Sequence, residues 1–203
     1  MAGEKVFPAI IDCDPGVDDA LALALAMASS EMELRAVTTV HGNIPLRMAH
    51  RNARRMVSFL HENLKQPGLA PPVYAGAGKP IRRGRIDRTI SYAIHGKDGL
   101  GDLFQKRALP ALGTNNDSRS ADQVIADLAR EYGKALRIIA IGPLTNLALA
   151  LKRDRYALAG VGRVVVMGGA ARMPGNATAA AEFNVHCDPE ATEVVMNCGA
   201  PIT

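Results

Sequence analysis

Four aspartates lie within eight positions between two apolar runs, in the stretch AIIDCDPGVDDALALALAMA at residues 9–28. Carboxylates held about 4 Å apart repel by roughly 4 kcal/mol per pair at an effective dielectric near 20. A single aspartate at this position could be explained as a helix N-cap, which stabilises a helix by about 0.5 to 2 kcal/mol. Four aspartates need protons or a cation, and oxygen ligands with no set of His and Cys ligands nearby favour Ca²⁺ or Mg²⁺. The four are Asp12, Asp14, Asp18 and Asp19.

The elements expected around these aspartates place the four carboxylates between a strand and a helix. An apolar run at 6–12 predicts a strand, a Pro-Gly pair turns the chain, and an Ala- and Leu-rich segment at 18–29 predicts a helix. Ligands of open parallel sheets bind outside the carboxyl ends of the strands, which is where the cluster falls. An EF-hand loop is excluded, because Gly16 and Leu23 occupy loop positions that require acids.

Strand and helix patterns alternate along the rest of the chain. The strand-like runs IIAI and VVVM are continuously apolar, as expected when helices cover both faces of a parallel sheet. We therefore predict an α/β fold, Rossmann-like, with a mostly parallel, doubly wound sheet and helices on both faces. Further strands are expected at 34–40, 136–141 and 163–167, and further helices at 45–60, 120–132 and 143–152.

The last residues predict one more helix and the opening of a strand. Asp188, Pro189 and Glu190 supply an N-cap, a proline at the first helical position and an acid in the first turn. Residues 200–203 then have the character of the next strand. We expect residues 1–203 to form a single domain that is truncated at its C-terminus.

Composition and charge argue against several classes of function. The net charge of +4 comes with arginines at helical spacing, Arg47, Arg51, Arg54 and Arg55, which is typical of a solvated helix face rather than a nucleic-acid site. The sequence has no run of 18 apolar residues and no secretory signal, so we expect no membrane partner and a cytoplasmic location. The three cysteines suggest no disulfide framework.

At the aspartates the sequence resembles a known family. IIDCDPGVDDALAL is similar to the N-terminal signature of the inosine-uridine-preferring nucleoside hydrolases, which are calcium-dependent N-ribohydrolases. Further matches follow in family order, namely AVTTVHGN, IHGKDGLGD, GPLTNLALAL, VVVMGGA and GNATAAAEFNVHCDPEA, and together they span nearly the whole chain. The resemblance implies a glycosidase that cleaves small ribonucleosides into ribose and free base in purine and pyrimidine salvage. It also implies a homo-oligomer, either a dimer or a tetramer.

The resemblance also implies a role for each site residue. Asp14 and Asp19 would bind Ca²⁺ together with the backbone carbonyl of Ile141. Asp14 would also take a proton from the calcium-bound water, while Asp12 would orient the ligands without binding the metal. The substrate-binding residues would be Asp18, Asn43, Glu182 and Asn184 at the ribose hydroxyls, Met167 and Asn176 in the sugar pocket, and His95 closing over the substrate.

Several alternatives stay open. His95 could instead be an ordinary loop histidine, and His41 and His186 are expected to pack or to face solvent. Family members continue beyond residue 203 with a histidine that protonates the leaving base and an aspartate that completes the calcium shell, so turnover by these 203 residues is expected to be slow. One competing reading is a haloacid-dehalogenase-like Mg²⁺ phosphatase with Asp12 as nucleophile. The other is a chain that binds ribosides without turnover.

Overall fold

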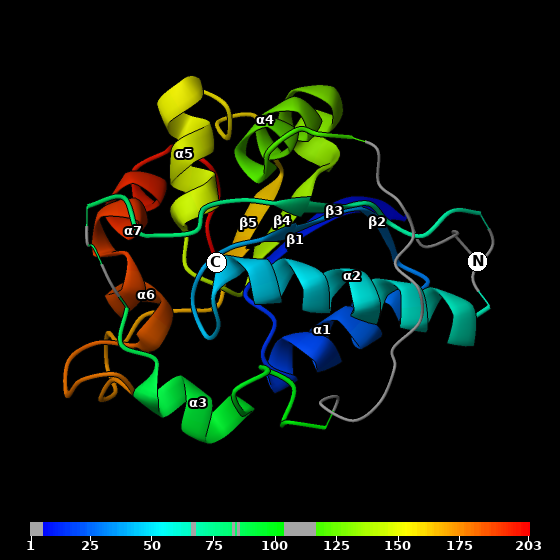
Figure 1. The fold of residues 1–203 in the computed structure, drawn as a ribbon. Coiled ribbons are helices and arrows are strands. Elements are labelled where there is room, and N and C mark those ends of the chain that lie inside the picture. The colour runs from blue at the N-terminus through cyan, green and yellow to red at the C-terminus, as the bar shows by residue number, and fades with distance from the viewer. Residues whose placement is uncertain (1–5, 66–67, 83, 85, 104–116) are drawn as a thin grey trace.

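A parallel sheet organises the computed structural model, which describes residues 6–65, 68–82, 84, 86–103 and 117–203. The order of its five strands is β3-β2-β1-β4-β5, and every neighbouring pair is parallel (Figure 1). The strand order reverses direction between β1 and β4, and this switch point is where open α/β sheets bind ligands. The strands are β1 (Phe7–Cys13), β2 (Met32–Thr39), β3 (Val73–Ala75), β4 (Arg137–Ala140) and β5 (Arg163–Val166).

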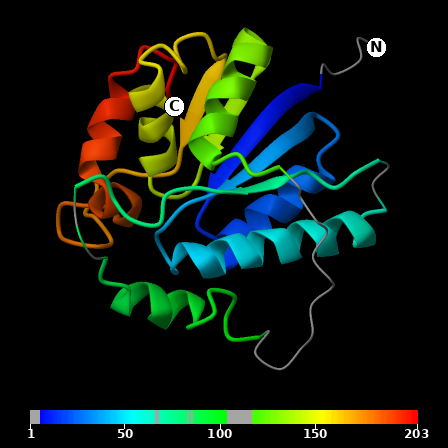
Figure 2. The same ribbon diagram turned by 45° about the horizontal axis from the view of Figure 1, so that its top comes forward.

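Helices cover both faces of this sheet, as predicted (Figure 2). Helices α1 (Val17–Ala28) and α2 (Leu46–Asn63) pack on one face, where Ile11 of β1 is buried. Helices α4 (Ala121–Tyr132), α5 (Thr145–Arg153) and α7 (Pro189–Met196) pack on the other face, where Ile10 is buried. Successive residues of β1 therefore enter two separate cores, which explains why its sequence is continuously apolar.

Three short elements lie where no element was expected. They are β3, α3 (Thr89–His95) and α6 (Phe183–Cys187), with three, seven and five residues. A 3-10 turn, η1 (Gly133–Ala135), also precedes β4. The predicted long elements are all present, with ends that differ by a few residues; the helix expected at 143–152, for example, begins at Thr145. In the described part of the chain, no helix is long and apolar enough to cross a membrane.

The expected final strand pairs with β5. Ile202 forms a parallel bridge with Val164, whose backbone N–H donates to the Pro201 carbonyl at 2.8 Å. The Thr203 N–H donates in turn to the Val164 carbonyl at 3.0 Å. The last residues therefore continue the sheet beyond β5.

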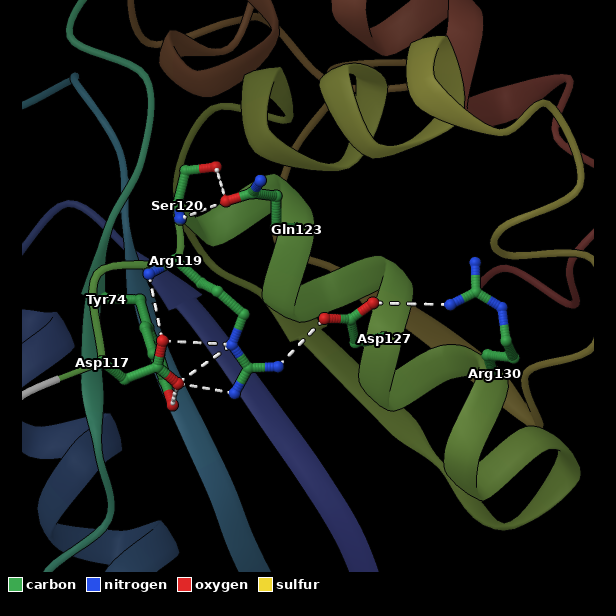
Figure 3. A network of polar contacts seen from close by, with 7 residues as sticks. All are labelled: Tyr74, Asp117, Arg119, Ser120, Gln123, Asp127 and Arg130. Atoms are coloured by element: carbon green, nitrogen blue, oxygen red, sulfur yellow. Dashed lines mark hydrogen bonds and ion pairs between the residues drawn. The ribbon is translucent and has the colours of Figure 1, made fainter.

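An exposed polar network connects the start of α4 to β3 (Figure 3). The Arg119 guanidinium donates to Asp117 at 2.6 Å and to Asp127 at 2.9 Å, and the Tyr74 hydroxyl donates to Asp117 at 3.1 Å. Hydrogen bonding from Arg119 holds the pKa of Asp117 well below its usual range. Ser120 begins α4 as predicted, and its N–H donates to the Gln123 side chain at 2.9 Å.

A buried polar triad joins three loops at the carboxyl edge of the sheet. The Thr145 hydroxyl donates to Asp188 at 2.7 Å and lies 2.8 Å from His41 Nε2. Because that hydroxyl donates to Asp188, it accepts from His41, whose Nε2 therefore carries the proton. Burial lowers the pKa of His41 to about 4, so the ring is neutral at physiological pH. The triad links the segment after β2, the start of α5 and the N-cap of α7.

Replacing the central hydroxyl should weaken the fold. The Thr145→Val variant keeps the shape of the side chain but leaves His41 Nε2 and the buried Asp188 carboxylate each without one partner. We expect urea denaturation to show a loss of about 1 to 3 kcal/mol in the free energy of unfolding. Thr145→Ser keeps the hydroxyl and serves as the control. Equal stability of the two variants would show that the triad does not hold these loops.

Candidate active site

Asp14 follows the end of β1, and its side chain lies between two glycines. A Cβ added to Gly42 would lie 1.9 Å from Asp14 Oδ2, and one added to Gly142 would lie 2.8 Å from Asp14 Oδ1. Gly42 comes after β2 and Gly142 after β4, so these glycines let the chain approach Asp14 from both neighbouring strands. The space for this carboxylate depends on residues that carry no side chain.

The Asp14 carboxylate is fully buried and only half hydrogen-bonded. Its Oδ2 accepts the Asn43 backbone N–H at 2.6 Å, whereas its Oδ1 has no hydrogen-bond partner among the described residues. Burial raises the pKa of Asp14 well above its usual value, and the nearby Asp19 carboxylate raises it further. A buried carboxylate in this state holds a proton or faces a cation.

Asp19 supplies the second buried carboxylate. Gly16 is the N-cap of α1, and Asp19, three positions into the helix, reaches back to accept the Gly16 N–H at 2.9 Å and the Asp14 N–H at 3.3 Å. Burial raises the pKa of Asp19 as well. Asp18 is exposed and does not cap the helix. The Asp19 side chain therefore joins Asp14, the turn at Gly16 and the start of α1 in one hydrogen-bonded unit.

Asp12 lies beside this unit in the sheet itself. Its Oδ1 accepts the Thr38 hydroxyl at 2.6 Å and the Asn146 amide at 2.7 Å, and the Asn146 oxygen accepts the Ala77 N–H at 2.8 Å. Burial raises the pKa of Asp12 to about 7. These partners tie β1 to β2, to α5 and to the segment after β3.

The third expected metal ligand is the carbonyl of Ile141, which follows β4. The Asn184 amide donates to this oxygen at 3.0 Å, and the Ile141 N–H donates to the Asp12 carbonyl at 2.8 Å. A carbonyl has two lone pairs, so one remains for a cation. Across the described residues, no group of three or more His, Cys, Asp or Glu side chains could hold a metal. The expected site has only two carboxylates, those of Asp14 and Asp19, together with one carbonyl. The lack of a hydrogen-bond partner for Asp14 Oδ1 among the described residues and the raised pKa of both carboxylates fit a hard divalent cation.

A pocket opens next to Asn43, whose N–H binds Asp14, and all seven expected substrate-binding residues line it. The carboxylates of Asp14 and Asp19 are not part of this lining. Sequence reasoning missed four others, Ile90, Ser91, Ile94 and Phe183. The sequence contained a signal for two of these residues, because Ile94 directly precedes His95 and Phe183 lies inside the EFN motif. The complete lining consists of Asp18, Asn43, Ile90, Ser91, Ile94, His95, Ile141, Met167, Asn176, Glu182, Phe183 and Asn184.

Residues around α6 form one wall of the pocket. Glu182 is the N-cap of this helix; its Oε1 accepts the Asn184 N–H at 2.9 Å, and its Oε2 accepts the Gly169 N–H at 3.1 Å. The Asn176 side chain accepts the Phe183 N–H at 2.8 Å. The Asn184 amide also donates to the Met167 carbonyl at 3.0 Å. These side chains hold the wall in place as well as facing the cavity.

His95 belongs to a helix, so its predicted placement in a loop is wrong. It is the last residue of α3, and the next residue, Gly96, is the C-cap with a φ of 74°. Its Nδ1 accepts the Val17 N–H at 3.3 Å and lies 3.7 Å from Asp18 Oδ1. The ring therefore rests on the first turn of α1 and brings α3 over the pocket. Both α3 and α6 lie at the same end of the molecule (Figure 1).

Curated proteins similar to this chain are nucleoside hydrolases. Uridine nucleosidase 1 of Arabidopsis thaliana is 41% identical over 96% of this chain and 54% of that protein. The pyrimidine-specific ribonucleoside hydrolase RihA of Salmonella typhi is 42% identical over 96% of this chain and 58% of its own length. The chain thus spans a little over half the length of these relatives.

Solved structures and a family model agree with these relatives. A plant nucleoside hydrolase, PpNRh1, has a TM-score of 0.83 at 34% identity and is matched over 97% of this chain and 58% of that one. The purine-preferring ribonucleoside hydrolase of Gardnerella vaginalis has a TM-score of 0.85 at 35% identity, over 96% and 59%. A family model described as inosine-uridine preferring nucleoside hydrolase matches residues 9–203. The chain therefore belongs to the inosine-uridine preferring nucleoside hydrolase family.

Proposed function

We propose that this protein hydrolyses the N-glycosidic bond of ribonucleosides and releases ribose and the free base. The observation that carries the proposal is the buried pair Asp14 and Asp19, which adjoin a pocket whose lining includes carboxylate and amide side chains. Membership of a nucleoside hydrolase family supports the reaction class. The similar proteins are named as uridine, pyrimidine or purine enzymes, so the proposal extends to ribonucleosides as a class.

The cofactor that we propose is Ca²⁺, held by Asp14, Asp19 and the Ile141 carbonyl. All three donors are oxygens, which suits a hard cation, and the unpartnered Asp14 Oδ1 offers a position for it. When bound, the ion supplies Lewis acidity that lowers the pKa of water. Three protein groups do not fill a calcium shell of six to eight oxygens, so further oxygen ligands would complete it.

Asp14 is the proposed general base. Its buried carboxylate would accept the proton of the attacking water. Breaking the bond gives the sugar the positive charge of an oxocarbenium ion, which nearby carboxylates stabilise. Asp18 and Glu182 line the pocket and would face that charge. No described residue is assigned to protonate the leaving base.

The sugar would be held by side chains from three regions of the chain. Asp18 lies in the first turn of α1, Asn43 follows β2, and Met167, Asn176, Glu182 and Asn184 all follow β5. A site that hydrogen-bonds ribose hydroxyls rejects deoxyribose, because its polar groups are then left unpaired. His95 would cover the bound substrate from α3. We also propose a cytoplasmic location. The family resemblance supports a role in nucleoside salvage and a homo-oligomer, either a dimer or a tetramer.

The phosphatase alternative gains no support from the geometry of Asp12. That side chain is completely buried: its Oδ1 is held by Thr38 and Asn146, and its Oδ2, which has no hydrogen-bond partner among the described residues, is buried as well. An aspartyl nucleophile must reach a phosphoryl group. A riboside-binding protein without turnover remains the second outcome of the activity test.

The first prediction concerns activity. With Ca²⁺ present, the 203-residue chain should release ribose from inosine or uridine and lose this activity when a chelator removes the metal. The matching 2′-deoxynucleoside should react far more slowly. Ribose binding with no release of base would instead favour the binding protein.

The second prediction separates the roles of the buried aspartates. By calorimetric titration, Asp19→Asn should weaken Ca²⁺ binding at least about tenfold more than Asp12→Asn, because Asp12 acts through its neighbours rather than on the metal. Asp127→Asn, on the exposed side of α4, controls for a general loss of negative charge. If Asp12→Asn and Asp19→Asn had equal effects, the assignment of Asp12 as a residue that orients the ligands without binding the metal would be wrong.

A further inference from the structure

We propose that Ser91 is a positioning residue that fixes the direction of the Asn43 side-chain amide, so that Asn43 presents its Nδ2–H to the ribose. This inference rests on the proposed function, in which Asn43 contacts a sugar hydroxyl. Ser91 lies in α3, which was not expected from the sequence, and it lines the same pocket. It would decide whether Asn43 acts as a donor or as an acceptor.

The first observation is the bond between the two side chains. The Ser91 hydroxyl donates to Asn43 Oδ1 at 3.0 Å, and both residues are buried. The Asn43 backbone N–H donates to Asp14 Oδ2 at 2.6 Å, so the backbone of this residue is fixed as well. With its oxygen held by Ser91, the amide can turn only its nitrogen toward the pocket.

The second observation is the pair of acceptor atoms near the Asn43 Nδ2 atom. The position of a Cβ on Gly16 would lie 3.0 Å from Asn43 Nδ2 and 2.9 Å from Asp18 Oδ1, so both atoms border the same small space. His95 Nδ1, 2.8 Å from that position, accepts a backbone N–H and is therefore an acceptor too. A reversed amide would turn the Asn43 oxygen toward these acceptors. A serine hydroxyl could bond either end, but the acceptors around Gly16 favour the nitrogen there.

This arrangement makes Asp18 and Asn43 a matched pair for one hydroxyl group. A carboxylate only accepts, so the sugar hydroxyl would donate its proton to Asp18. The same oxygen would then accept from Asn43 Nδ2. A hydrogen in place of the hydroxyl satisfies neither partner. The pair would therefore account for part of the preference for ribose over a deoxyribose.

The helix that carries Ser91 has other anchors. Arg88 Nε donates to the Gly42 carbonyl at 2.8 Å, and His95 contacts the first turn of α1. Removing the Ser91 hydroxyl should therefore leave α3 in place. The change can act on the orientation of the amide without removing the wall of the pocket.

The first experiment measures binding of ribose, 2-deoxyribose and 3-deoxyribose to the whole chain by calorimetry. Ser91→Ala should weaken ribose binding about three- to tenfold, the worth of one hydrogen bond. It should leave unchanged the affinity of the one deoxy sugar that lacks the hydroxyl between Asp18 and Asn43. Ser91→Thr keeps the hydroxyl and should restore ribose binding. Equal weakening of all three sugars, or no change, would overturn the proposal.

The second experiment needs no activity and no ligand. In ¹⁵N-edited NMR spectra, the Asn43 side-chain NH₂ signals are identified by their loss in Asn43→Asp. They should show contacts to the Gly16 Hα protons in the original chain, and these contacts should weaken in Ser91→Ala. Contacts to the Ser91 Hβ protons instead would show the reversed amide. A chain that shows the expected contacts but binds no ribose would refute the proposed function and leave the positioning by Ser91 intact.

Discussion

The close burial of Asp14 and Asp19 is the constraint around which the rest of this structure is arranged. Each carboxylate accepts backbone N–H groups, and each has its pKa raised by burial, with Asp19 raising that of Asp14 further. Hydrogen bonds from neutral donors offset only part of the cost of burying a charge. The pair therefore needs protons or a cation, and the choice between them decides what the pocket beside it can do.

The fold places Asp14 and Asp19 at the switch point of the sheet. Parallel strands bring the ends of β1, β2 and β4 to one edge, and Gly42 and Gly142 leave room for Asp14 there. Behind this edge, the triad around Thr145 connects the same loops to α7. On the open side, α3 brings His95 and Ser91 over the pocket. Stability and binding thus depend on the same few loops.

The sequence predicted the parts of this arrangement that local patterns encode. Apolar runs such as IIAI predicted a sheet that is buried on both faces. The start of α7 was predictable because Asp188 and Pro189 form a local signal for the beginning of a helix. Helix α3 was not predictable, because its seven residues are held by contacts with Gly42, Asn43 and the start of α1. Pairs such as Ser91 and Asn43 are 48 residues apart, so only the folded chain brings them together. The family resemblance named seven pocket residues but not the bonds that orient them.

Proton release on calcium binding tests the central claim most directly. In the metal-free chain, burial keeps Asp14 and Asp19 protonated at a pH where free aspartate is ionised, so Ca²⁺ must displace protons to bind. Calorimetry in two buffers with different ionisation enthalpies counts these protons. We expect at least about one proton per calcium near pH 6 and fewer near pH 8, since more of the carboxyl groups are already ionised at the higher pH. Calcium binding without proton release at either pH would contradict the burial of these carboxylates as the source of the site, and the absence of calcium binding would contradict the site itself.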